Sequence, residues 1–130
     1  MNTTPQAPLS GITILDLTRL LPGPVATMHL ADMGATVIKI EDKGVGDYAR
    51  TMSHVRHELS QLFIAFNRGK QIINLDLKNQ EDHARFLHMV DTADVVIESF
   101  RPGVMNRLGL GWEVLKARNP RLVKIGRAHV

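Results

Sequence analysis

Apolar residues along the chain fall into short runs that are separated by helical patterns. The first run spans Ile12 to Leu17 and the second spans Val37 to Ile40. Between them lie a Pro-Gly-Pro turn at 22–24 and a helical segment from Val25 to Met33. We therefore predict a strand, a helix and a second strand, which is the smallest unit that makes a right-handed parallel crossover.

Two residues mark the ends of this first predicted helix. Pro24 suits the first helical position, where its missing N–H costs nothing. Gly34 suits the left-handed position just past the helix end. The helix would then present unpaired N–H groups at the edge of the sheet where the strands end, which favours the binding of anions there.

The rest of the chain continues the alternation. A polar segment from Glu41 to Ser60 interrupts it, and we interpret this segment as a long surface loop. Asn79 can cap the helix that begins at Gln80. After the loop the pattern predicts a helix, a strand, a helix, a strand, two short helices and the start of a strand, at 61–66, 71–76, 80–91, 95–97, 102–107, 112–118 and 122–123.

This order of elements predicts an α/β fold, Rossmann-like and doubly wound, with a mostly parallel sheet. Ligands on such sheets bind beyond the carboxyl ends of the strands. In this chain those ends are the segments 17–23, 41–43, 76–78 and 99–102. We expect the functional residues to come from these segments.

Composition and charge narrow the function classes. The chain has 130 residues, 44% apolar and 22% charged, which is enough for one modest domain. It has no cysteine, no apolar run of membrane-spanning length and no secretion-signal layout, and we expect a cytoplasmic protein without membrane contact. The net charge is +3, but the basic residues are scattered among few aromatics, so we predict no nucleic-acid binding. His54 and His57 lack a third ligand, and we predict no metal site.

The last residues differ in character from the segment before them. Leu122 and Val123 read as the start of a buried strand, which should continue with apolar residues, but polar residues follow. The codons ATC GGA AGA GCA CAC GTC encode 125–130, and that string begins a common short-read sequencing adapter. The preceding adapter bases, AG, would complete an AAG codon for Lys124. We therefore interpret residues 124–130 as a non-native tail, which the source nucleotide sequence can test.

Four segments resemble one known family. They are LDLT followed by GPVATMHLADMGATVIKIE, then NRGKQIINLDLK at 67–78, ADVVIESFRPGVMNRLGLG at 93–111 and NPRLV at 119–123. Together these segments resemble the start of family III CoA-transferases of the CaiB/BaiF type. This family includes formyl-CoA and carnitine CoA-transferases and the 2-methylacyl-CoA racemases. The resemblance implies that residues 1–123 are the N-terminal part of a CoA-binding α/β domain, truncated from a larger domain.

The resemblance also implies a set of CoA-binding residues, with coenzyme A or acyl-CoA as the substrate and no metal. In the family, the residues just before the Gly-Pro pair contact CoA, and a basic residue near the end of the second strand pairs with its phosphates. The backbone at the end of the third strand holds the adenine, and the Phe-containing turn lies along the CoA and is followed by a phosphate-binding Arg. The matching positions are Leu21, Pro22, Lys39, Leu75, Asp76, Leu77, Lys78, Ser99, Phe100, Arg101 and Arg107.

Three positions depart from the family pattern. Many transferases carry Gln where Leu21 stands, and this difference favours the racemase-like branch. The family often has a basic residue where Asp42 stands, so Lys39 or Lys43 would have to supply the charge. Many members have Asn in place of Ser99.

The implied reaction needs residues that this chain does not contain. In the family, transferases use an Asp that attacks the acyl-CoA thioester, and racemases use a His and an Asp to move a proton. Both sets lie beyond the NPRLV segment, so we assign no catalytic residue here and expect no turnover from this polypeptide alone. The family acts on acyl-CoA and a carboxylic acid as interlocked homodimers, which we expect of the full-length protein.

Two alternatives remain at this stage. An NAD-binding Rossmann domain would share the first crossover, with Glu41 placed to hold a ribose, but the chain lacks the G-x-G-x-x-G loop. A non-enzymatic ligand-binding domain would fold as a stable monomer. Whether the activity is that of a transferase or of a racemase stays open.

Overall fold

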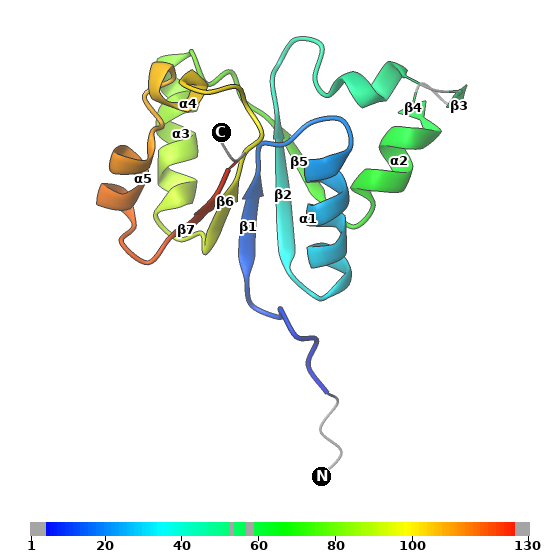
Figure 1. The fold of residues 1–130 in the computed structure, drawn as a ribbon, viewed down its shortest axis with the longest axis horizontal. Helices are drawn as coiled ribbons and strands as arrows, with labels where there is room; N and C mark the ends of the chain where they lie inside the picture. The colour runs from blue at the N-terminus through cyan, green and yellow to red at the C-terminus, as the bar shows by residue number, and fades with distance from the viewer. Residues whose placement is uncertain (1–4, 53, 57–58, 127–130) are drawn as a thin grey trace.

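The computed structural model describes residues 5–52, 54–56 and 59–126. Five parallel strands form one sheet, and helices cover both of its faces (Figure 1). The strands of this sheet are β1 (Thr13–Asp16), β2 (Thr36–Glu41), β5 (Gln71–Asn74), β6 (Val95–Ile97) and β7 (Val123–Ile125). The helices are α1 (Pro22–Asp32), α2 (Gln61–Asn67), α3 (Gln80–Val90), α4 (Val104–Arg107) and α5 (Trp112–Arg118). A 3₁₀ helix, η1 (Tyr48–Thr51), and a small hairpin of β3 (Val55–Arg56) and β4 (Leu59–Ser60) complete the described elements.

The strand order is β5-β2-β1-β6-β7, so the chain starts at the centre of the sheet and winds outward in both directions. Helices α1 and α2 lie on one face, and α3, α4 and α5 lie on the other (Figure 1). This arrangement confirms the predicted α/β doubly wound class, with a main sheet that is entirely parallel. The order of winding reverses between β1 and β6, and such switch points are where open α/β sheets bind ligands.

The central strand β1 divides the core into two layers. Ile14 is paired in register with Val37 of β2 and Val95 of β6, and it belongs to the smaller cluster that α1 covers. Leu15 belongs to the larger cluster, with Phe86 of α3 and Leu115 of α5. Each of these buried large side chains contributes about 1.5–3 kcal/mol relative to an exposed position. The two clusters hold the carboxyl ends of the strands at one fixed edge.

Local signals place most element ends where the sequence predicts them. Asn79 caps α3, because its side chain accepts hydrogen bonds from the N–H groups of Glu81 and Asp82. Gly34 follows α1 with φ +100°, and Gly103 precedes α4 with φ +82°, both in the left-handed region that favours glycine.

The start of α1 differs from the prediction. The helix begins at Pro22 rather than near Pro24, so both prolines lie in its first turn. The first N–H groups of a helix have no partner within it, and prolines there lose no hydrogen bond.

The segment 41–60 is not the simple surface loop that we predicted. Asp47 is 1% exposed and Ala49 is fully buried. The hydroxyl of Ser60 donates to the Ala49 carbonyl and accepts from the N–H of Phe63, so it joins η1 to α2. Polar side chains fix this segment, and hydrophobic periodicity does not detect such anchors.

The last strand extends beyond Val123. Lys124 pairs in register with Val96, and Ile125 with Ile97, while Val123 and Ile125 are about half exposed. The proposed tail therefore begins inside β7, and its residues 127–130 lie outside the described part. The boundary after Val123 stays a prediction. Within the described ranges, no helix has the length and apolar character needed to cross a membrane.

Candidate functional site

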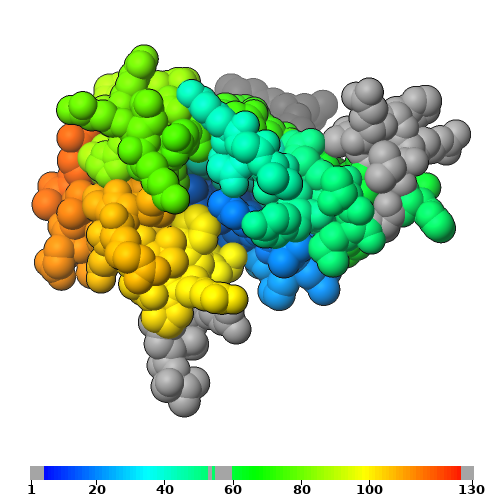
Figure 2. Space-filling view, turned by 90° about the horizontal axis from the view of Figure 1, so that it is seen from above, coloured from blue at the N-terminus to red at the C-terminus, as the bar shows by residue number. Residues whose placement is uncertain are grey.

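Two cavities open at the carboxyl edge of the sheet. One, of about 380 Å³, lies over the ends of β1, β2 and β5, and we call it the β5-side cavity. The other, of about 750 Å³, lies over the switch point between β1 and β6, and we call it the switch cavity. Arg19 and Phe100 line both cavities, so the two adjoin. Figure 2 looks onto this edge and shows the blue chain that follows β1 at the bottom of a hollow, between the green, cyan and yellow segments that follow β5, β2 and β6.

Most of the predicted CoA-binding residues line these cavities. Residues 75–78 line the β5-side cavity, and Pro22 and residues 99–101 line the switch cavity. Leu21 lines neither cavity; it is the N-cap residue of α1 and is 50% exposed at the rim. The structure thus brings together segments that are about 80 residues apart in sequence, because parallel strands end at the same edge.

Arg107 lies at a third hollow that adjoins the first. This hollow has a volume of about 380 Å³ and is lined by Lys78, His83 and Arg107, among others. Its residues Leu77, Lys78 and Leu108 also line the β5-side cavity. Among the residues that the structure describes, neither Lys78 nor Arg107 forms an ion pair. Two exposed cations without a carboxylate partner favour the binding of an anion here.

The predicted phosphate contact by Lys39 is not supported. Its side chain is fully buried, and its Nζ atom donates to Asp47 at 2.8 Å and to the Thr18 carbonyl at 3.0 Å. A buried ammonium is held by its own partners and does not reach a ligand at the surface. The sequence placed this lysine correctly at the end of β2 but could not show that Asp47, eight residues later, would fold back onto it.

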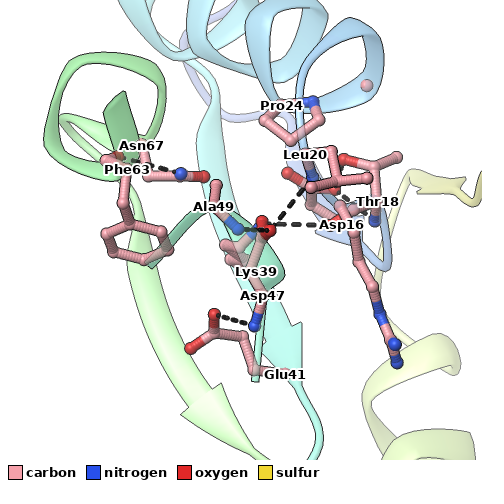
Figure 3. A network of polar contacts seen from close by, with 12 residues as sticks. Asp16, Thr18, Leu20, Pro24, Lys39, Glu41, Asp47, Ala49, Phe63 and Asn67 are labelled. Atoms are coloured by element: carbon pink, nitrogen blue, oxygen red, sulfur yellow. Dashed lines mark hydrogen bonds and ion pairs between the residues drawn. The ribbon is translucent and has the colours of Figure 1, made fainter. Parts of the chain in front are cut away.

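Asp47 is the centre of a polar network (Figure 3). Its Oδ1 atom accepts hydrogen bonds from the N–H groups of Leu20 at 3.0 Å and Ala49 at 2.9 Å, and its own N–H donates to Glu41 at 3.0 Å. Burial opposes ionisation of this carboxyl, but the hydrogen bond from Lys39 and those from the two backbone N–H groups outweigh it. The pKa of Asp47 is therefore lowered from its ordinary value.

The network holds a strained turn. Leu20 has φ +70° and is the only non-glycine residue of the described part with a positive φ. An L-residue in this conformation costs about 1–2 kcal/mol. The hydrogen bond from Leu20 N–H to Asp47 offsets part of this cost, and strain of this kind is concentrated at functional sites.

A second buried ion pair, Lys70–Asp16, joins the end of β1 to the first turn of α1. The Nζ atom of Lys70 lies 3.2 Å from Asp16 Oδ2, with both side chains fully buried, and also donates to the Pro24 carbonyl and to Asn67. Asp16 accepts from the hydroxyls of Thr18 and Thr27 as well. Burial lowers the pKa of Lys70, since desolvation outweighs the attraction of Asp16.

Asp76 and Asp82 shape the turn after β5. Asp76 Oδ1 accepts from the N–H of Lys78 at 3.0 Å, and the N–H of Asp76 donates to Asp82 at 2.9 Å. Lys43 pairs with Asp82 at 2.7 Å, and this bond together with the one from Asp76 lowers the pKa of Asp82. Asp76 therefore orders the backbone that lines the cavity, and Lys43 is engaged by a carboxylate.

Sequence reasoning missed Arg19. This residue lies three positions after the end of β1, and its guanidinium lies 5.5 Å from the centre of the Phe100 ring and 3.5 Å from Asp42 Oδ2. About one third of its side chain is exposed. The sequence did contain a signal for it. A residue that follows the carboxyl end of the central strand lies at the switch point, where open α/β sheets bind ligands.

The described residues offer no metal site. No group of three or more His, Asp or Glu side chains in the described ranges is placed to hold a metal ion. In the pair of histidines at 54 and 57, His54 is exposed, while His57 and the adjacent Glu58 lie outside the described residues.

Comparison with known proteins adds to this geometry. A family model described as CoA-transferase family III matches residues 9–127. The acetyl-CoA:oxalate CoA-transferase of Acetobacter aceti is 49% identical over 119 residues, which cover 92% of this chain and 31% of that protein. A probable fatty acyl-CoA transferase of Mycobacterium tuberculosis, Rv3272, is 44% identical over 124 residues, again 31% of its length.

Solved structures agree with these sequence matches. A crystal structure of Rv3272 has a TM-score of 0.87 and 42% identity, and the match covers 95% of this chain and 34% of that one. A CAIB/BAIF family protein from Brucella suis has a TM-score of 0.87 and 37% identity, with 94% and 33% covered. The chain therefore spans about a third of the length of the relatives that it matches.

Proposed function

Because the chain belongs to CoA-transferase family III, we propose that it is the CoA-binding part of an enzyme that moves coenzyme A from an acyl-CoA to a carboxylic acid. The two relatives described above are named as transferases that act on CoA thioesters. For this reason we propose a transferase and not a racemase, although Leu21 replaces the Gln of many transferases. The observation that carries the proposal is the pair of adjoining cavities at the switch point, lined by the segments that the family resemblance selects.

The ligand would lie along the carboxyl edge of the sheet. Residues 75–78 would hold the adenine in the β5-side cavity, since they line it and hydrogen bonds to the side chains of Asp76 and Asp82 order their backbone. Lys78 and Arg107 would bind phosphate, because both are exposed and neither pairs with a described carboxylate. The pantetheine arm would pass Phe100 and enter the switch cavity, past Ser99 and Arg101, toward Pro22 and the rim at Leu21.

The chemistry itself is proposed for the whole protein. We assign no catalytic residue to these 130 residues, and their acidic groups at the carboxyl edge already have structural partners, as Asp16, Glu41 and Asp47 show. We propose that the full-length enzyme is a cytoplasmic homodimer that takes acyl-CoA and a carboxylic acid. Acyl-CoA exchange by the 130-residue chain alone would contradict this division of labour.

The NAD-binding alternative loses its main support in the structure. Glu41, which would have to hold the ribose, is 4% exposed. Its carboxylate accepts from Arg50 at 2.6 Å and from the N–H of Asp47 at 3.0 Å. A carboxylate engaged in this way is not free to bind a ribose hydroxyl.

Calorimetric titration of the chain with CoA and with NADH tests the proposal. We expect CoA to bind and NADH not to bind. Arg107→Gln should weaken CoA binding by about 1.5–3 kcal/mol, the usual range for a hydrogen bond to a charged group. Arg121→Gln is the matched control, because Arg121 is exposed just before β7, at the opposite edge of the sheet. Equal affinity of the Arg107 variant and the unaltered chain would overturn the assignment of this residue, and absence of CoA binding would overturn the function.

A further inference from the structure

The buried ion pair Lys39–Asp47 makes two hydrogen bonds to the turn that follows β1. Lys39 Nζ donates to the Thr18 carbonyl at 3.0 Å, and Asp47 Oδ1 accepts from the Leu20 N–H at 3.0 Å. The two side chains are fully buried and lie 2.8 Å apart (Figure 3). Arg19 lies between the two bonded residues, Thr18 and Leu20, so the ion pair fixes the backbone on both sides of this arginine.

Arg19 leaves the turn toward the space where the two cavities meet. It lines both of them, and its guanidinium carbon lies 5.5 Å from the Phe100 ring centre, within the range of a cation–π contact. Stacking on a ring orients the planar guanidinium and leaves its N–H edge for a second partner. A guanidinium edge matches the oxygens of a phosphate group in a bidentate way.

We propose that the Lys39–Asp47 pair is a positioning device for Arg19, and that Arg19 binds the diphosphate of the CoA ligand where the two cavities meet. The inference rests on the proposed CoA binding. A ligand with its adenosine end in the β5-side cavity and its pantetheine end in the switch cavity has its middle at Arg19 and Phe100. In CoA that middle is the diphosphate.

Asp42 pairs with Arg19 and would compete with a bound phosphate, so substituting Asp42 tests the proposed diphosphate contact. Its Oδ2 atom lies 3.5 Å from Arg19, and its Oδ1 atom accepts from the N–H groups of Gly44 and Gly46 at 2.9 Å. A phosphate bound to Arg19 would lie close to this carboxylate, and the two negative charges would repel each other. Asp42→Asn keeps an oxygen for the two glycine N–H groups but removes the competing charge, so CoA should bind several times more tightly. Unchanged or weaker CoA binding by this variant would contradict the inference.

The ligand arm of the test compares CoA with pantetheine, which has no phosphate. Arg19→Gln should weaken CoA binding about ten- to hundredfold, the range for a charged hydrogen bond, and leave pantetheine binding unchanged. Arg19→Lys should recover only part of the loss, because an ammonium lacks the planar fork. Arg121→Gln again serves as the control for a lost surface charge. Unchanged CoA affinity of Arg19→Gln would overturn the diphosphate contact, while the proposed function would stand.

The positioning arm needs no ligand. Lys39→Met/Asp47→Asn removes the buried charges but keeps an oxygen that accepts from Leu20 N–H, whereas Lys39→Met/Asp47→Leu removes that acceptor. Amide hydrogen exchange at Leu20 should be about tenfold faster in the second variant than in the first, the effect of one lost hydrogen bond. The Arg19 Nε–H resonance, shifted by the Phe100 ring current, should move toward its random-coil value in both variants, because both lose the Lys39 bond to the Thr18 carbonyl, and it should move further in the second. Identical exchange and identical Arg19 shifts in the two variants would overturn the positioning role.

The two arms separate this inference from the function on which it rests. If the unaltered chain binds neither CoA nor pantetheine, the proposed function is wrong and the diphosphate contact falls with it. The Leu20 and Arg19 signals would still decide whether the pair positions Arg19. If CoA binds and only the Arg19 and Asp42 variants behave contrary to expectation, the inference alone is wrong.

Discussion

The basic side chains on the two halves of the carboxyl edge differ in burial and in ion pairing. On the side of α1 and α2, the side chains of Lys39 and Lys70 are fully buried and paired with Asp47 and Asp16. On the side of α3 and α4, Lys78, Arg101 and Arg107 are exposed, and none of them forms an ion pair with a described residue.

This difference shows how to distinguish basic side chains that stabilise the fold from those that are available to bind a ligand. Removing an ion from water costs several kcal/mol, and only close partners in good geometry offset that cost. A buried lysine is therefore committed to its partner, while an exposed arginine without a partner keeps its charge for a ligand. Both kinds occur at strand ends in this sequence, so position along the chain does not distinguish them, but exposure does.

The largest effect should come from breaking a buried pair. Lys39→Met leaves the carboxylate of Asp47 buried without its cation, and we expect a loss of about 3–5 kcal/mol in the free energy of unfolding. Urea denaturation measures this loss. The comparison variant is Lys43→Met: Lys43 is 56% exposed, and its partner Asp82, although 5% exposed, keeps the N–H of Asp76 and the nearby Arg85, so the loss should be about 1 kcal/mol and smaller than that of Lys39→Met. Equal losses in the free energy of unfolding of the two variants would show that burial of the cation does not determine the cost of removing it.

The next largest effect should appear in acid. The pKa of Asp47 is lower in the folded chain than its ordinary value of 3.8, so its contribution to stability is complete above that pH and is lost as the pH falls through the lowered pKa. Urea midpoints of the unaltered chain should fall steeply below about pH 3.8. The variant Lys39→Met/Asp47→Asn, which lacks this carboxyl, should lose less stability over the same range. Parallel curves for the two proteins would argue against a lowered pKa for Asp47.

Salt should distinguish the two halves by a smaller amount. An exposed contact between unit charges at 4 Å is worth about 1 kcal/mol in water and is screened by added salt, whereas buried pairs are screened far less. We expect CoA affinity to fall by about 1 kcal/mol or more between low and high sodium chloride. Comparing calorimetry with urea midpoints across the same salt series tests this, and the midpoints should move little.

The smallest effect should come from an exposed pair away from the carboxyl edge. Arg118 of α5 makes two bonds to Asp91, at 2.8 and 2.7 Å, with both side chains partly exposed. Arg118→Gln should cost about 0.2–1 kcal/mol, the range measured for exposed pairs. A urea titration that gave a loss as large as that of Lys39→Met would contradict the ranking.

Much of the fold follows from local signals. The apolar runs at β1, β2 and β6, the cap at Asn79 and the left-handed Gly34 are determined by neighbouring residues, and the structure has them where the sequence places them. The parallel order then brings the strand ends to one edge. For that reason the strand ends predicted at 76–78 and 99–102 contain residues that line the cavities, 76–78 and 99–101, whereas Leu75 is assigned by the family resemblance.

The parts that escaped prediction depend on contacts between distant segments. The burial of Lys39 requires Asp47 to fold back beneath the turn after β1, and no periodicity reports such a contact. The importance of Arg19 arises because β6 lies beside β1, which places Phe100 within reach of its guanidinium. Hydrophobic patterns locate the strands, whereas these polar contacts are defined only once the sheet has formed.

The close approach of Gly23 to Thr18 limits what variation this corner can accept. A methyl group added at position 23 would lie 2.2 Å from Cβ of Thr18, well inside contact distance. Even alanine would therefore force the first turn of α1 away from the end of β1. In a saturation library scored for CoA capture, position 23 should return glycine alone, while its exposed neighbour Leu21 should accept many residue types.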